Sequence, residues 1–115
     1  NEKMIENVRR LEPIFMGGLK KFEELEHIGE ARGIGLMGAL EMVQDKKSKK
    51  SFDGSISIGE RVANKCIENG LICRPLGPSI VLCPPFITTD DEMEIIFDTL
   101  DKTLKNVFNE VKSLI

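Results

Sequence analysis

Apolar residues recur at helical spacing in three segments, and the last segment is the most regular. Its apolar face has no break and consists of Met93, Ile96, Phe97, Leu100, Leu104, Val107, Phe108 and Val111. Thr89 and Glu92 precede this face at the spacing of a capping box, in which each side chain bonds a backbone N–H of the first turn. Asp90 and Asp91 add negative charge where the helix dipole favours it. The pattern predicts a long helix packed along one side.

The two other helical segments are less regular. From about Met4 to Leu25 the apolar residues share a face, but Pro13 and the pair Gly17-Gly18 interrupt the segment. An interior proline removes a backbone hydrogen bond and costs about 3 kcal/mol, so we expect a kinked or interrupted helix. Residues 58–69 predict a short helix that ends at Asn69-Gly70; its apolar stripe is Val62, Ala63, Cys66 and Ile67.

Between these helices the sequence favours two pairs of strands. The first pair is expected near 28–32 and 35–43, and the second at 71–74 and 79–83 around a turn of Pro75 to Pro78. Pro84-Pro85 ends the last strand, because proline cannot donate to a ladder. Residues 45–57 are polar and are expected to form a loop. The order of elements predicts an α+β fold, with a small, largely antiparallel sheet and helices packed on one face.

Residues 33–38 match the G-x-G-x-x-G pattern of dinucleotide-binding loops. That loop follows a fully buried strand, whereas the residues before this match include Glu30 and Arg32. No βαβ unit follows it. We therefore interpret the glycines as positions of close backbone approach or of a bulge between two short strands.

Composition narrows the class of protein. The 115 residues suit one domain, and a net charge of −3 gives no reason to expect nucleic acid. The cluster Lys46 to Lys50 is expected to be a solvated loop, because like charges repel. No apolar run is long enough to cross a membrane, and the N-terminus does not resemble a signal peptide. Because the chain does not begin with Met, we expect it to be part of something longer.

Candidate chemistry is sparse. His27 is the only histidine, and the cysteines Cys66, Cys73 and Cys83 have no metal-ligand or disulfide spacing, so no metal site is expected. Each cysteine lies among apolar residues, where a free thiol usually serves as a small hydrophobe, and a cytoplasmic location is the simplest interpretation.

Arg74 is the exception. It follows an apolar run at the end of a predicted strand, and its rigid set of donors suits a carboxylate or phosphate. A surface arginine, or one paired with Glu41, remains the alternative.

Two segments are similar to class III (omega) aminotransferases, which use pyridoxal 5′-phosphate. Residues 29–41 resemble the family signature G-x-x-R-G-x-G-L-x-x-G-x-E, and residues 70–86 resemble its hairpin G-L-x-x-R-P-x-G-x-x-I-x-L-x-P-P. The resemblance covers nearly the whole chain, in order. Pro78 and Phe86 depart from it, since the family often has Asp or Asn and Leu there.

The resemblance implies that residues 1–115 are a single C-terminal small domain of a larger, dimeric aminotransferase. The cofactor-binding large domain would be absent, so no catalytic or cofactor-binding residue is expected in this chain. The position matching Arg74 binds the substrate carboxylate in the branch that uses omega-amino acids, amines or diamines with a keto acid such as pyruvate. Val81 replaces an arginine of the ornithine branch, which disfavours that branch. The isolated chain is expected to be inactive and to bind the cofactor poorly.

Two alternatives stay open. The substrate could instead be that of a diaminopelargonate-type aminotransferase or of an aminomutase, which the hairpin motif does not separate. The size of the chain and its lack of catalytic groups also fit a free-standing regulatory α+β module that binds a small molecule.

Overall fold

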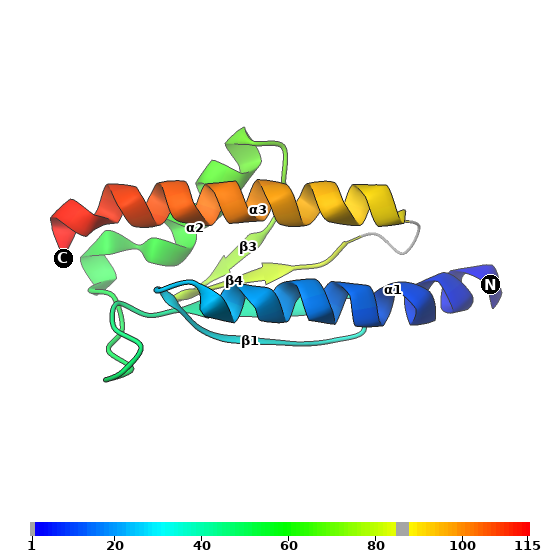
Figure 1. Cartoon of the computed structure of the whole chain (residues 1–115). Helices are drawn as coiled ribbons and strands as arrows, with labels where there is room; N and C mark the ends of the chain where they lie inside the picture. Colours follow the sequence, from blue (N-terminus) through cyan, green and yellow to red (C-terminus); the bar gives the residue numbers. More distant parts are fainter. Residues whose placement is uncertain (1, 85–87) are drawn as a thin grey trace.

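The computed structural model describes residues 2–84 and 88–115, in which three α-helices cover one face of a four-stranded antiparallel sheet (Figure 1). This arrangement confirms the predicted α+β class. Pro85 and Phe86 of the hairpin motif lie outside the described residues. The elements in chain order are α1 (Glu2–Lys21), β1 (Ile28–Ile34), β2 (Met37–Met42), α2 (Ile58–Glu68), β3 (Arg74–Leu76), β4 (Ser79–Leu82) and α3 (Asp90–Val111), with 3₁₀ turns at Phe22–Glu24, Gly54–Ile56 and Lys112–Leu114.

The sheet consists of two hairpins joined along their inner strands, in the order β1-β2-β4-β3. Both hairpins close through two residues, Gly35-Leu36 and Gly77-Pro78. The glycines have φ values of +58° and +57°, respectively. A positive φ at the first central residue is what a type II′ hairpin turn requires, and proline is accommodated at the second. The glycine-rich run 33–38 therefore contains a hairpin turn between two strands, and it is not a phosphate loop.

Strand β3 lies further along the chain than the pattern predicted. It comprises Arg74 to Leu76, whereas residues 71–73 lead into it without regular structure. Apolar composition had suggested a strand at 71–74 and a turn that included Pro75. Pro75 is tolerated within the strand because β3 is at the edge of the sheet, where a missing N–H need not be paired on its outer side.

Helix α1 continues through Pro13 and both glycines. Leu11, Phe15 and Leu19 are fully buried, while Pro13 and Gly17 are exposed. Burying each of these large side chains contributes about 1.5–3 kcal/mol, which together exceeds the cost of about 3 kcal/mol for an interior proline. The ribbon bends within its N-terminal half rather than breaking (Figure 1).

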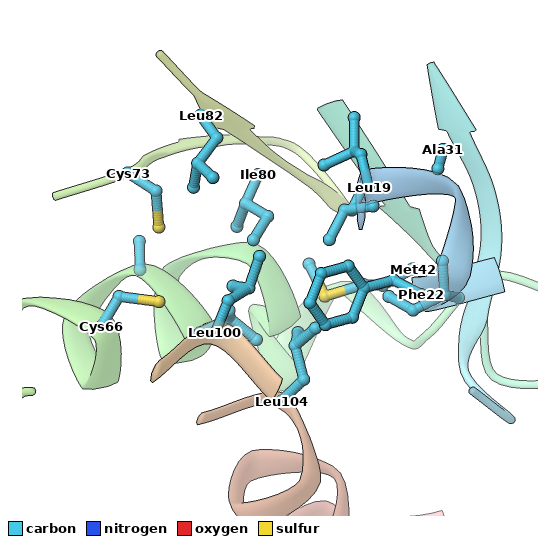
Figure 2. Close-up of a cluster of buried hydrophobic side chains, with 14 of the residues drawn as sticks. Leu19, Phe22, Ala31, Met42, Cys66, Cys73, Ile80, Leu82, Leu100 and Leu104 are labelled. Carbon is cyan, nitrogen blue, oxygen red and sulfur yellow. The ribbon is translucent and has the colours of Figure 1, made fainter. Parts of the chain in front are cut away.

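The core lies between the inner face of the sheet and the helices (Figure 2). Leu40 and Ile80 from the central strands belong to the same buried cluster as Leu100 and Leu104 of α3, and all four are at most 1% exposed. The predicted capping box of α3 is confirmed: Glu92 N–H donates to Thr89 Oγ1 at 3.2 Å, and Thr89 N–H donates to Glu92 Oε1 at 3.1 Å. Its apolar face is therefore fixed against the sheet from the first turn.

Candidate functional site

Arg74 lies on the face of the sheet that the helices do not cover, because side chains alternate between the two faces along a strand. Arg74 is directly opposite Val81 in the β3–β4 register. Ile80 and Leu82 point into the core, so Val81 and its partner Arg74 face the other way. The same row continues through Ala39 to Arg32 on β1. Two arginines thus lie at opposite ends of one row of side chains.

The two arginines differ in whether an acidic side chain lies next to them. Arg32 Nη1 lies 3.3 Å from Glu30 Oε2 and 3.6 Å from Glu41 Oε2. Glu41 therefore pairs with Arg32 and not with Arg74, the alternative that the sequence left open. Within residues 2–84 and 88–115, no hydrogen bond or ion pair to the side chain of Arg74 is found, and the residue is exposed. Its guanidinium is available to an external anion.

A hollow of about 540 Å³ lies beside Arg74, between the segment that precedes β3 and the end of β4. Its lining is mainly apolar and includes Leu71, Ile72, Val81, Leu82 and Ile96. A fixed positive charge at the edge of such a surface can bind a carboxylate through two parallel N–H donors, while apolar neighbours contact the carbon skeleton. Of the roles that the sequence left open for Arg74, this geometry favours carboxylate binding.

The only histidine, His27, is packed inside the fold and does not lie at the candidate site. His27 is buried; its Nδ1 lies 3.1 Å from the Val43 carbonyl oxygen, and the rings of Phe52 and Phe108 lie 5.3 and 5.1 Å away. No group of three metal-ligating side chains occurs among the residues described. The ion pair between Arg32 and Glu41 was not predicted from the sequence. Alternation along two paired strands would have placed both side chains on one face of the sheet.

Two expectations about surface residues need correction. Cys83 is exposed, whereas Cys66 and Cys73 are buried. It follows the last residue of β4, where the inward-facing pattern ends. In the lysine cluster, Lys46 is half-buried because its Nζ donates to the Glu23 carbonyl oxygen, while Lys47, Lys49 and Lys50 are exposed as expected.

A pyridoxal phosphate site does not fit the described residues. Such a site needs a lysine that can form a Schiff base inside a pocket. The lysines are exposed or half-buried on the outer surface, and none lines the hollow beside Arg74.

No helix in the described part of the chain is long and apolar enough to cross a membrane.

Comparison with known proteins defines the class. The family model for class III aminotransferases matches residues 1–104. The chain is 38% identical over 104 residues to an adenosylmethionine-8-amino-7-oxononanoate aminotransferase of Methanocaldococcus jannaschii, covering 90% of this chain and 23% of that protein. It is also 33% identical over 111 residues to gamma aminobutyrate transaminase 1 of Solanum lycopersicum, covering 96% of this chain and 22% of that protein.

Solved structures agree with this assignment. A crystal structure of an omega-transferase from Vibrio fluvialis is 57% identical, with a TM-score of 0.95, covering 98% of this chain and 27% of that one. An omega-aminotransferase from Paracoccus denitrificans is 57% identical, with a TM-score of 0.93, covering 96% of this chain and 25% of that one.

The chain belongs to the class III aminotransferase family, whose members depend on pyridoxal phosphate. It spans about a quarter of the length of the relatives that it matches.

Proposed function

We propose that residues 1–115 form the C-terminal small domain of an aminotransferase that moves an amino group between an omega-amino acid, amine or diamine and a keto acid such as pyruvate. In this proposal Arg74 binds the substrate carboxylate. The observation that carries it is the exposed guanidinium of Arg74, which has no ionic partner among the described residues and lies beside an apolar hollow.

The substrate class is supported by similarity as well as by geometry. The two structures named as an omega-transferase and an omega-aminotransferase are each 57% identical to this chain. Val81, opposite Arg74, is half-buried and uncharged, so the row offers no second cation next to the guanidinium. A substrate with one carboxylate near the reacting centre fits this arrangement.

The rest of the protein would supply what this chain lacks. We propose that the large domain of the same polypeptide, in a cytoplasmic homodimer, holds pyridoxal phosphate. The role of Arg74 is to bind and orient: it contacts a keto acid strongly and a carboxylate-free amine weakly. A long side chain with a permanent charge suits alternation between two such substrates.

Substitution of Arg74 in the longer protein tests the carboxylate role. Arg74→Ala should lower kcat/KM for the keto acid about 30- to 150-fold, equivalent to about 2–3 kcal/mol for a charge-assisted bidentate contact. The value for a carboxylate-free amine donor, measured in its own half-reaction, should change little. Arg74→Lys should recover part of the loss, since it keeps the charge without the planar donors.

Arg32→Ala is the matched control, because Arg32 lies in the same row but pairs with Glu30 and Glu41. It should affect both substrates equally. Equal losses for both substrates in Arg74→Ala would contradict the assignment of Arg74.

A diaminopelargonate-type aminotransferase is the second candidate, together with an aminomutase of the same family. It is favoured by the 38% identity to the adenosylmethionine-8-amino-7-oxononanoate aminotransferase. Profiling the longer protein with 8-amino-7-oxononanoate, diamines and pyruvate would separate the candidates. Activity confined to 8-amino-7-oxononanoate would replace the first proposal.

A free-standing regulatory module is the alternative of another class. A small domain without its partner should give no absorbance band of a lysine-bound cofactor when pyridoxal phosphate is added to the 115-residue chain, and such a band would contradict the small-domain proposal. The coding sequence upstream decides the rest. An in-frame region that encodes a Schiff-base lysine would exclude the module, and its absence would exclude the small-domain proposal.

A further inference from the structure

Two buried cysteines face each other behind the strand that carries Arg74. The sulfur of Cys73, just before β3, is directed toward α2, where the sulfur of Cys66 lies across from it (Figure 2). Cys66 is 0% and Cys73 5% exposed, and both are free thiols. The Leu71 N–H donates to the Cys66 carbonyl oxygen at 2.7 Å, which holds the start of the intervening segment against the helix. This hydrogen bond fixes the segment between the two cysteines to the end of α2.

The two thiols differ in character. A hydrogen bond between them raises the pKa of Cys66, and burial raises it further. The same hydrogen bond lowers the pKa of Cys73. Thiol–disulfide exchange also requires access to the attacking sulfur. Cys73 lies in the irregular segment before β3 and lines the hollow beside Arg74, whereas Cys66 is fully buried within α2, so Cys73 attacks first and Cys66 resolves.

Cys73 is buried but is one of the residues that line the hollow beside Arg74. It lies between Ile72, which is 81% exposed, and the exposed Arg74. Residues 71–73 have no regular secondary structure, so a small local opening uncovers the sulfur without unfolding a helix or strand. Cys66, within α2 and fully buried, has no comparable route.

We propose that Cys66 and Cys73 are a redox pair that a small-molecule disulfide converts into an intramolecular disulfide. The Cys73 thiolate attacks one sulfur of the small molecule, forming a mixed disulfide and releasing one thiolate. The Cys66 thiol, on losing its proton, then displaces the second thiolate and forms the Cys66–Cys73 bond. The two cysteines are oxidised, and the small-molecule disulfide is reduced to two thiols.

The cross-link would join α2 to the segment that enters the edge strand β3. It requires nothing of the role proposed for Arg74, so each can fail without the other. Its expected physical effect is to restrict local opening of residues 70–74, which hydrogen exchange reports as slower amide exchange in that segment.

The test uses the 115-residue chain with Cys83→Ser, which removes the exposed third thiol. After incubation with oxidised glutathione under native conditions, mass spectrometry should show the loss of two hydrogen atoms, and peptide mapping should place the bond between Cys66 and Cys73. In the same background, Cys66→Ser should accumulate a glutathione adduct on Cys73. Cys73→Ser should leave Cys66 unmodified.

Circular dichroism checks that each variant is folded. Two free thiols in the folded Cys83→Ser chain, a cross-link that forms only in denaturant, or preferential glutathione addition at Cys66 would overturn the proposal. Reversal of the cross-link by a dithiol reductant, with recovery of both thiols, is also expected.

Discussion

A single buried hydroxyl links the two helices α2 and α3. Thr103 is 0% exposed, and its Oγ1 donates to the Thr99 carbonyl oxygen at 2.7 Å. The same oxygen accepts a hydrogen bond at 2.9 Å from Nδ2 of Asn69, the residue that ends α2. The end of α2 is thereby fixed to the middle of α3, just before the segment that leads to Cys73 and Arg74.

We expect Thr103→Val to lower the free energy of unfolding by about 1 kcal/mol, because valine keeps the shape but loses the bond to Asn69. The amide of Asn69 is exposed enough to be hydrated, which keeps the cost moderate. Urea denaturation measures the change. In a double-mutant cycle with Asn69→Ala, the two losses should overlap; strictly additive losses would mean that the contact contributes nothing.

At the scale of one element, α1 places two adjacent glycines in opposite environments. A Cβ on Gly17 would meet nothing within 4 Å, whereas a Cβ on Gly18 would lie 2.4 Å from Cε2 of Phe97. The Phe97 ring is held in place, since it lies 6.0 Å from the rings of both Phe15 and Phe22. The absence of a side chain at Gly18 therefore allows α1 and α3 to approach.

Alanine substitutions at the two positions should change stability in opposite directions. Gly17→Ala should raise the free energy of unfolding by about 0.5–1 kcal/mol, because it improves helix propensity without a clash. Gly18→Ala gains the same propensity but should be destabilising overall, since overpacking costs about 1–3 kcal/mol. Thermal unfolding of both variants is the measurement, and a stabilised Gly18→Ala would show that Phe97 moves freely.

At the scale of the whole molecule, three carboxylates in separate segments accept hydrogen bonds from nearby backbone or side-chain donors. Glu23 has a lowered pKa because its Oε2 accepts a 2.9 Å hydrogen bond from Ala31 N–H on β1. Asp45 has a lowered pKa because Ser48 Oγ and Lys47 N–H donate to it, and Asp53 because Ser55 N–H and Oγ donate to it. All three prefer the charged form in the folded state.

This preference gives a pH dependence of known sign. A carboxyl group with a lowered pKa in the folded state stabilises the fold above its ordinary pKa, which is 4.5 for Glu23 and 3.8 for the two Asp residues. That contribution disappears as the pH falls through the lowered values. The melting temperature should therefore fall with acidification below pH 4.5, and less steeply in the triple variant Glu23→Gln, Asp45→Asn, Asp53→Asn. Parallel curves would contradict the role of these groups.

Local patterns in the sequence were sufficient for much of this fold. Helical periodicity and the capping box located α3, because both depend on residues within a few positions of one another. Two β-rich runs around a Pro/Gly turn likewise indicated the second hairpin, although β3 begins later in the chain than expected. The family motifs around Arg74 gave the candidate site, and the carboxylate-binding role of this exposed residue stays a prediction.

Contacts between distant segments decided the rest, since their energies do not appear in any local pattern. Pro13 is tolerated because α1 buries Leu11 and Phe15 against the sheet and α3, and β3 begins at Arg74 because the edge of the sheet accepts Pro75. The pairing of β2 with β4 places Arg32 and Arg74 in one row, and the pairing of β1 with β2 brings Glu41 close to Arg32. The sequence alone thus determined which elements form. Packing between these elements determined that the Arg74 guanidinium stays unpaired within the described part of the chain and that Cys66 and Cys73 lie near each other.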